Sequence, residues 1–376
     1  MHIEIGINIR QKEGFSAFVP SKFPPKGIHD LHHKLQVKAS KAERYVGKLD
    51  GITHTLPDID FFLEMFVKKD ATSSAQIEGT KATMVDALEM EAGLASKETD
   101  ADDILYYIKA LHYGLKRMES FPLSLRFIRE LHGQLMTGAR SSHNADPGNF
   151  RKSQNWIGGT NPSNASFVPP PAHEIGRALT DLEAFMHEEE SFLPLIHSAL
   201  VHAQFETIHP FLDGNGRTGR LLMTMLWARR EILEKPVLFL SSYFKKHQKI
   251  YYEKLQKYHE GDVEGWVSFF LDGIIDIAKE STLISKDITQ LRNDDMAKMQ
   301  GLAKREATSG IPVLQKLYSR PIVSSKTVMD WTGFTRAGAQ KLIDRFVNLE
   351  ILEIKDEKAN YHRTYRYKKY IDIFIR

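Results

Sequence analysis

Apolar positions at helical spacing run through most of the first 310 residues. They recur three and four residues apart, which predicts amphipathic α-helices. Strand signals are scarce in this part of the chain, so we expect an all-α fold. The predicted helices cover 31–49, 58–67, 71–77, 83–95, 102–118, 124–136, 172–186, 193–207, 217–230, 241–258 and 263 to about 302.

Two stretches interrupt this helical pattern. Residues 1 to about 30 are punctuated by Pro and Gly, and we expect an extended arm there. Residues 137–171 are dense in Gly, Asn, Ser and Pro. A loop of this length inside a helical domain is uncommon and is often functional.

The pattern changes again near residue 310. Short helices are predicted over 312–319, 326–331 and 336–349. Two short apolar stretches, 351–354 and 364–367, follow on either side of a polar turn. A helix-turn-helix followed by a hairpin is the layout of a winged helix. We therefore divide the chain into 1–110 (an arm and a helical region), 111–305 (the core) and 306–376 (a winged helix-turn-helix).

Composition narrows the class of protein. The chain of 376 residues has no cysteine, which excludes disulfides and cysteine nucleophiles and fits a reducing compartment. It shows no apolar leader at its N-terminus and no uncharged apolar run near the roughly 20 residues that span a bilayer. We expect a soluble, cytoplasmic protein without a membrane partner. Positive charge gathers in residues 311–376, which hold 13 Lys and Arg against 7 Asp and Glu.

The candidate chemistry lies in residues 209–220, His-Pro-Phe-Leu-Asp-Gly-Asn-Gly-Arg-Thr-Gly-Arg. A glycine-rich turn before a helix offers free backbone N–H groups and a positive helix end to a phosphate. His209 can accept a proton near neutral pH, and Asp213 offers the oxygen ligands that Mg²⁺ prefers. Arg217 and Arg220 can each bind phosphate oxygens with two nitrogens. These groups together suit transfer of a phosphoryl-type group from a nucleotide to a nucleophile.

Other glycine-rich nucleotide sites fit this stretch poorly. Gly214, Gly216 and Gly219 match the dinucleotide fingerprint, but a helical segment precedes them where a Rossmann loop follows a buried strand. A Walker loop needs Gly-Lys-Ser/Thr, and a protein kinase needs a downstream His-Arg-Asp; neither is present. We also read His197 and His202 as structural, because no carboxylate at a suitable spacing supports a zinc site.

Residues 209–220 resemble the signature of the Fic (filamentation induced by cAMP) family, His-Pro-Phe-x-Asp/Glu-Gly-Asn-Gly-Arg-x-x-Arg, at every fixed position. The resemblance implies a helical core that transfers AMP from ATP to a Ser, Thr or Tyr hydroxyl of a target protein or of itself. It implies that His209 deprotonates the hydroxyl, that Asp213 holds Mg²⁺ and that Arg220 lies near the γ-phosphate. The ATP-binding residues that it implies are Gly214, Asn215, Gly216, Arg217, Thr218, Gly219, Arg220 and Tyr252.

The long loop extends this resemblance. Gly148-Asn149-Phe150-Arg151, residues 155–159 and residues 167–171 are similar to the flap region of the family, with the flap loop itself at 158–168. A flap would bind an extended target segment through main-chain hydrogen bonds, as an added strand. The residues we expect to dock the target are Gly158, Gly159, Thr160, Phe167 and Val168.

A second motif lies upstream. Ser74-Ala75-Gln76-Ile77-Glu78-Gly79 resembles the inhibitory motif of the same family, Ser/Thr-x-x-x-Glu-Gly/Asn. By that resemblance Glu78 would form a bidentate pair with Arg220 and occupy the arginine that the γ-phosphate needs. Ser74 would hold the inhibitory helix in place. In relatives the same glutamate can assist removal of AMP.

The basic C-terminal segment leaves alternatives open. Positive and aromatic side chains on a recognition helix and a wing would suit DNA phosphates. A second hypothesis is therefore a DNA-binding regulator whose core senses a nucleotide; a third keeps the enzyme but changes the donor or reverses the reaction. The oligomeric state is open, with a homodimer among the forms. The candidate DNA contacts are Arg336, Gln340, Lys341, Arg345, Lys355, Lys358, Arg363, Arg366, Lys368 and Lys369.

Overall fold

The fold is mainly helical, as the sequence predicts. The computed structural model describes residues 3–54, 56, 59–94, 100–138, 146–188, 191–355 and 363–375. In chain order the helices of the core region are α1 (Ile28–Thr53), α2 (Ile59–Ile77), α3 (Met84–Glu91), α4 (Ala101–Met118), α5 (Leu125–Met136), α6 (Ala172–Met186), α7 (Pro194–Ile208), α8 (Asn215–Arg229), α9 (Ser241–Lys246), α10 (Gln248–His259) and α11 (Val263–Gln300).

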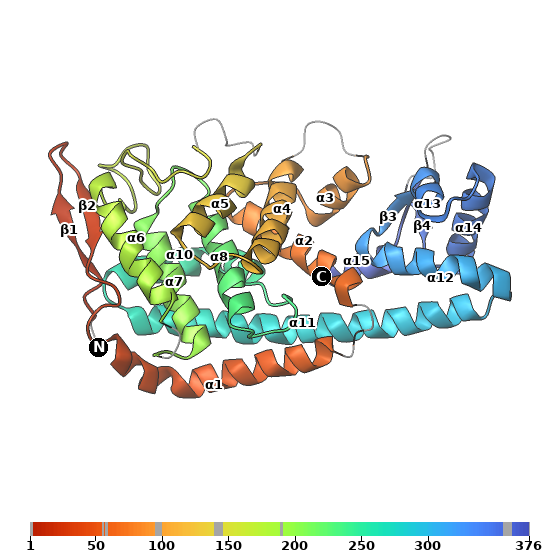
Figure 1. The fold of residues 1–376 in the computed structure, drawn as a ribbon, viewed down its shortest axis with the longest axis horizontal. Helices are drawn as coiled ribbons and strands as arrows, with labels where there is room; N and C mark the ends of the chain where they lie inside the picture. Colours follow the sequence, from red (N-terminus) through yellow and green to blue (C-terminus); the bar gives the residue numbers. More distant parts are fainter. Residues whose placement is uncertain are drawn as a thin grey trace.

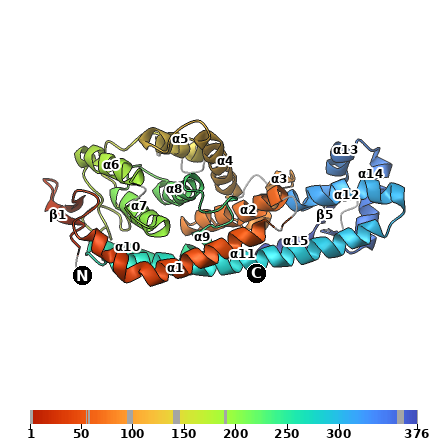
Figure 2. The ribbon, with the colours of Figure 1, turned by 60° about the horizontal axis from the view of Figure 1, so that its bottom comes forward.

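Two long helices form the base of the molecule. α1 and α11 lie side by side below the other helices (Figures 1 and 2). The Lys38 ammonium of α1 donates to the Ser268 hydroxyl and to the Asp272 carboxylate of α11, each at 2.6 Å. α11 continues past the end of α1 and connects the core to the C-terminal region (Figure 1). This single helix therefore contacts both the core and the C-terminal region.

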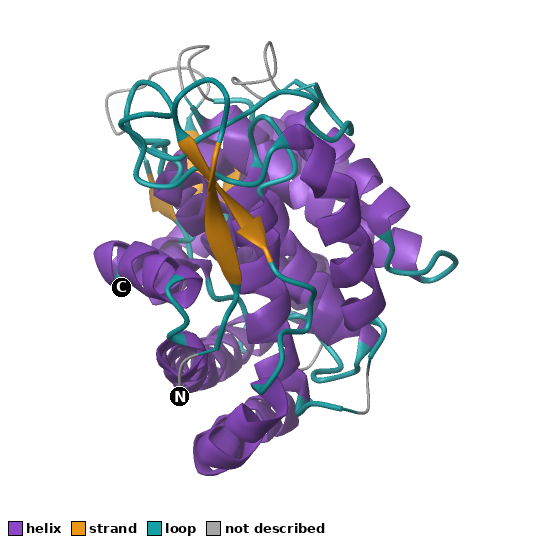
Figure 3. Cartoon of the chain, turned by 90° about the vertical axis from the view of Figure 1, so that its left-hand side faces the viewer, coloured by secondary structure: helices purple, strands orange, loops and turns teal. Residues whose placement is uncertain are grey.

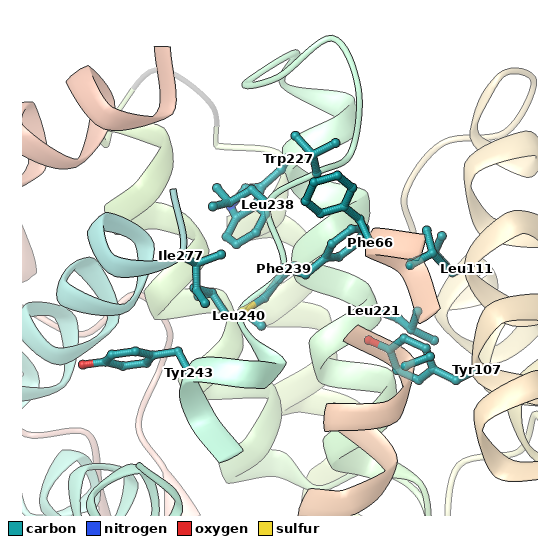
Figure 4. Packing of buried hydrophobic residues seen from close by; sticks show 14 of the residues in the cluster. Phe66, Tyr107, Leu111, Leu221, Trp227, Leu238, Phe239, Leu240, Tyr243 and Ile277 are labelled. Carbon is teal, nitrogen blue, oxygen red and sulfur yellow. The ribbon is translucent and has the colours of Figure 1, made fainter. Parts of the chain in front are cut away.

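The centre of the core is α7. Every residue from Leu195 to Ile208 is buried, including the polar His197, His202 and Glu206, so the other elements surround this helix on all sides. α8 packs against it and is buried from Arg217 to Trp227. Figure 4 shows the aromatic packing beside α8, where Phe66 of α2 and Tyr107 of α4 lie near Leu221 and Phe239.

The N-terminal arm folds into a hairpin that the sequence interpretation missed. β1 (Gly6–Arg10) pairs antiparallel with β2 (Ser16–Pro20), and the hairpin crosses the end of the helical core (Figure 3). The apolar positions at 3, 5, 7 and 9 have the two-residue period of a strand, so the signal was present. Ile3 and Ile5 are buried, whereas Ile7 and Ile9 are exposed.

Three helix boundaries also differ from the prediction. α2 is continuous through residues 68–70, where we predicted a break, because no Gly or Pro interrupts it. The helix predicted over 241–258 is two helices that meet at His247. α12 (Lys304–Ser319) begins eight residues before the predicted start and contains Pro312 in its interior.

The C-terminal region is a small helical unit with a sheet. α12 is followed by β3 (Ile322–Ser324), α13 (Ser325–Thr332), α14 (Arg336–Asn348), β4 (Glu353–Ile354), β5 (Thr364–Arg366) and α15 (Lys368–Ile375). The sheet has the order β3-β5-β4, with both neighbouring pairs antiparallel. The predicted helices and the β4–β5 pair are present, whereas β3 and α15 were not predicted. The winged-helix interpretation itself stays a prediction.

The C-terminal unit packs directly against the helix that carries the predicted inhibitory motif. The ring centroid of Phe62 in α2 lies 4.7 Å from that of Tyr318 and 6.3 Å from that of Tyr370. The ring centroids of Phe66 and Phe374 lie 5.2 Å apart. The predicted boundary at 110/111 falls inside α4, and the three-part division stays a prediction. Across the described residues, no helix combines the length and apolar character needed to cross a membrane.

Candidate active site

The glycine-rich motif forms the short loop between α7 and α8. His209 follows the last residue of α7 with a left-handed backbone (φ 49°), and Gly214 starts α8 with φ 75°. The Asn215 side chain closes the loop, because its amide accepts from Phe211 N and donates to Phe211 O at 2.8 and 2.9 Å. We expected Asn215 to offer side-chain donors to an anion; one of them is used within the loop.

The first turn of α8 receives no side-chain cap from its N-cap residue, Gly214. As in any α-helix, the backbone N–H groups of this turn point out of the helix end and not to a carbonyl within the helix. A Cβ atom at Gly216 would lie 2.3 Å from Glu78 Oε1 and 2.9 Å from Arg220 Nη1. Glycine therefore lets charged groups approach the positive end of α8 closely. This end of the helix is suited to bind an anion.

His209 is held with one nitrogen against the end of α7. Its Nδ1 lies 3.3 Å from the Glu206 carbonyl, so Nδ1 carries the hydrogen and Nε2 is left as an acceptor. Burial, together with the nearby Arg151 charge, lowers the pKa of His209 to about 4. The imidazole is therefore neutral at pH 7 and can accept a proton.

Three residues that the sequence interpretation gave no role hold this loop. Arg151 donates to His209 O at 2.8 Å and to Pro170 O at 2.6 Å, and Asn155 donates to Phe211 O at 2.8 Å. His132 of α5 accepts from Gly148 N at 2.9 Å and lies 3.0 Å from Asp213 O. Arg151 and Asn155 lie in segments that the flap resemblance already included, whereas a lone His on a distant helix has no sequence signal that ties it to this loop.

The predicted inhibitory residues contact Arg220. Arg220 donates from Nε to Ser74 Oγ at 2.8 Å and from Nη2 to Glu78 Oε1 at 2.7 Å. The predicted bidentate pair is wrong, because only Nη2 binds the carboxylate while Nε is taken by Ser74. Burial opposes the charge of Arg220, but the Glu78 carboxylate outweighs it and raises the pKa of Arg220. Arg220 is 2 % exposed, so its guanidinium meets the Glu78 carboxylate largely shielded from water.

The remaining motif side chains take up varied positions. Arg217 is buried, with Asp103 and Asp213 oxygens 3.7 and 3.8 Å from its guanidinium. Asp213 is 45 % exposed and accepts from Gly214 N at 2.6 Å. The Thr218 hydroxyl donates to Gly214 O at 2.8 Å, and Gly219 faces α7.

The tyrosine pair on α10 is split between core and surface. Tyr251 is buried and its hydroxyl lies 2.9 Å from His202 Nε2, whereas Tyr252 is 44 % exposed. Tyr252 is therefore free to stack on a ligand. His197 and His202 both bond within the core, and no group of three or more His, Asp or Glu residues suited to a metal occurs among the described residues.

The flap is a compact exposed loop. Ile157 and Phe167 form an isolated antiparallel bridge, and Gly158 and Gly159 between them have φ 70° and 69°. Thr160 N donates to the Asn164 side chain at 2.9 Å, which closes the tip. Val168 O already accepts from Phe18 N of β2 at 2.9 Å. Of the predicted docking residues, Gly158, Gly159 and Thr160 are thus the exposed ones.

Comparison with known families agrees with this geometry. The model of the Fic/DOC family matches residues 122–227, and the model of the Fic/DOC family N-terminal region matches residues 37–116. The first range holds α5 to α8 with the motif and flap. The second holds α2 with Ser74 and Glu78.

Curated relatives match part of the chain. The chain is 34 % identical over 155 residues to protein adenylyltransferase Fic of Aedes aegypti, covering 40 % of this chain and 27 % of that protein. It is 31 % identical over 209 residues to the Drosophila grimshawi protein of that name, covering 53 % of this chain and 39 % of that protein. The chain thus spans well under half the length of these relatives.

Solved structures support the fold. A Fic family protein from Desulfovibrio desulfuricans G20 superimposes with a TM-score of 0.55 at 19 % identity, covering 88 % of this chain and 95 % of that one. A Fic domain containing signaling protein from Bacteroides thetaiotaomicron VPI-5482 gives 0.52 at 19 % identity, covering 64 % and 97 %.

Proposed function

Residues 122–227 belong to the Fic/DOC family and residues 37–116 to its N-terminal region, and on this premise we propose that the protein transfers AMP from ATP to a hydroxyl of a target protein. The observation that carries the proposal is the neutral His209 beside the open N-terminus of α8, with Arg220 on the same helix. Base, anion site and cation lie within one loop and one helix turn.

The reaction would proceed by displacement at the α-phosphate. His209 Nε2 takes the hydroxyl proton, and the hydroxyl oxygen forms a bond to the α-phosphorus. The bond from that phosphorus to the bridging oxygen breaks, and its electron pair leaves with pyrophosphate. The backbone N–H groups of α8 and the guanidinium of Arg220 stabilise the phosphate charge.

Asp213 fits the role of the Mg²⁺ ligand. Its carboxylate is half exposed, and Mg²⁺ is usually held by one or two carboxylates together with substrate phosphates. The ion would supply charge neutralisation to the leaving pyrophosphate. Exposed Tyr252 would stack on the adenine, and a target segment would pair with the flap at residues 158–160.

We propose further that Glu78 restrains this activity. A Cβ atom at Gly216 would lie 2.3 Å from Glu78 Oε1, so the carboxylate covers the N-terminal end of α8. The same oxygen accepts a hydrogen bond from Arg220 Nη2. A phosphate and Glu78 would compete for one arginine and one helix end. ATP could then bind only with its γ-phosphate displaced from Arg220.

ATP labelled at the α-phosphate, supplied with Mg²⁺ and a cell lysate, tests both proposals. We expect little label on protein with the parent, strong label with Glu78→Gly, and none with Glu78→Gly/His209→Ala. ATP labelled at the γ-phosphate is the matched control, since a kinase would transfer only that label. If no sample transfers the α-phosphate label of ATP to protein, and α-labelled UTP and GTP also leave no label on protein, the result would contradict the proposed activity.

The DNA-binding alternative has less support from the C-terminal unit. Many of its predicted DNA contacts already bind protein groups: Arg345 with Glu306, Lys355 with Glu89, Arg366 with Glu353, Lys368 with Asp372 and Lys369 with Glu350. Gln340 donates to Tyr365 Oη, and Lys358 lies outside the described residues. Arg336 and Lys341 are exposed on α14. Salt-dependent binding of duplex DNA, weakened by Arg336→Ala/Lys341→Ala, would restore this hypothesis. A homodimer and a cytoplasmic location remain predictions from the sequence.

A further inference from the structure

Next to His209 lies a buried carboxyl group that the proposed mechanism does not use. Glu206, in the last turn of α7, is 8 % exposed. Its Oε1 has no hydrogen-bond partner among the described residues. A buried carboxyl oxygen without a partner is costly and rarely occurs without a purpose.

The two carboxyl oxygens face different neighbours. Oε2 lies 3.8 Å from His209 Nδ1, on the side of the ring away from the nitrogen that would take the proton. Oε1 lies over Gly219 of α8, where a Cβ atom would be 2.6 Å from it. Gly219 is therefore the residue that leaves room for this carboxyl group. Glu206 lies outside the fixed positions of the Fic signature, and Gly219 fills one of its variable positions.

Charged and titratable groups of several elements lie near Glu206. Burial, with the Glu78 charge adding to it and Arg220 of α8 opposing it, raises the pKa of Glu206 to about 8. His209, just after α7, lies 3.8 Å from Oε2, and Tyr251 and Tyr252 of α10 interact with its charge. His202 of α7 borders the same place over Gly219. Departure of Glu78 would remove one negative neighbour and favour the Glu206 carboxylate.

We propose that Glu206 is a positioning residue for the His209 base, whose carboxylate balances the positive charge that the imidazole gains when it takes the hydroxyl proton. This inference rests on the proposed role of His209. The Nδ1–H bond to the Glu206 carbonyl fixes the ring, and Nε2 receives the proton. The imidazolium then has a carboxylate 3.8 Å from Nδ1, which stabilises it. No proton leaves the pair until AMP transfer is complete.

Ring-nitrogen NMR of the parent protein tests this contact without ATP or a target. We expect the His209 signals, assigned by their loss in His209→Ala, to shift in a step between about pH 7 and 9 as Glu206 ionises. Glu206→Gln should remove that step while the thermal unfolding profile keeps its single transition. Glu206→Asp should retain a smaller step, because the carboxylate moves one CH₂ away from Nδ1. A step that persists unchanged in Glu206→Gln, or no step in the parent, overturns the inference.

Kinetics in the unrestrained enzyme supply the second readout. In Glu78→Gly we expect kcat for AMP transfer to rise with pH. Adding Glu206→Gln to that variant should lower kcat about tenfold at pH 8.5 and should flatten the rise of kcat with pH. The KM for ATP should stay unchanged. If kcat depends on pH in the same way in Glu78→Gly and in Glu78→Gly/Glu206→Gln, the inference is overturned. If Glu78→Gly transfers no AMP at all, the proposed function fails, while the NMR step still reports on the Glu206–His209 contact.

Discussion

At the scale of single residues, His132 links acid stability to the geometry of the loop between α7 and α8. Burial lowers the pKa of His132 to about 4, below the ordinary value of 6.5 that it regains on unfolding. The unfolded chain therefore binds more protons between these values, and the free energy of unfolding falls as pH drops from about 6.5 to 4. We expect the parent to lose about 2 kcal/mol more than His132→Gln between pH 7 and 5, by linkage. Urea unfolding of both proteins at the two pH values measures this. An equal loss in both would show that His132 is not responsible.

Sequence reasoning reached the residues of one continuous motif and missed those that come from elsewhere. Residues 209–220 could be interpreted together because their chemistry lies within one loop and one helix turn. Ser74 and Glu78 could be linked to Arg220 only through a second motif. Arg151 was reached only as part of the flap resemblance, without its bonds to the loop, and His132 had no link at all, since their partners are backbone carbonyls and amides. A backbone partner leaves no complementary side chain in the sequence.

At the scale of elements, the N-terminal hairpin supports the flap. The Phe18 ring of β2 lies 5.8 Å from Phe167 and 5.2 Å from His259, and Phe167 stacks on His259 at 4.0 Å. We expect Phe18→Ala to speed hydrogen exchange at the amides of Ile157 and Ser166 by about tenfold or more, because the bridge loses its support. Ile7→Ala on the exposed face of β1 is the matched control and should leave exchange unchanged. Equal exchange in both variants would contradict this support.

Helix periodicity predicted the elements better than their ends. The apolar pattern located α4, α5, α6, α7 and α11 closely, because each buries a long continuous face. It split α2 and joined α9 to α10, since a helix end depends on tertiary packing as much as on local residues. The continuity of α2 matters, because one unbroken helix carries Phe62 and Ser74 and ends directly before Glu78.

At the scale of the whole molecule, the C-terminal unit packs against α2, the helix that ends next to Glu78, the residue proposed to restrain the site. Besides the aromatic contacts of α2, buried Lys68 lies 3.6 Å from Glu64 and 3.3 Å from Glu91 of α3. Lys355, just after β4, binds Glu89 of α3 at 2.6 Å. The C-terminal unit therefore contacts both α2 and α3. Weakening this contact should therefore allow the C-terminal end of α2, next to Glu78, to move.

Phe62→Ala tests that coupling. Phe62 is 1 % exposed, and its loss should lower the free energy of unfolding by about 3–5 kcal/mol, the usual range for a buried Phe. Because α2 is continuous, we expect the weakened docking to raise the population in which Glu78 has left Arg220, and so to increase AMP transfer severalfold in the parent. In the Glu78→Gly background the same change should leave transfer unaltered, since no restraint remains. Phe334→Ala, on the exposed surface of the C-terminal unit, should change neither rate. An equal fold-change in both backgrounds would mean that Phe62 acts on the enzyme in general and not through α2.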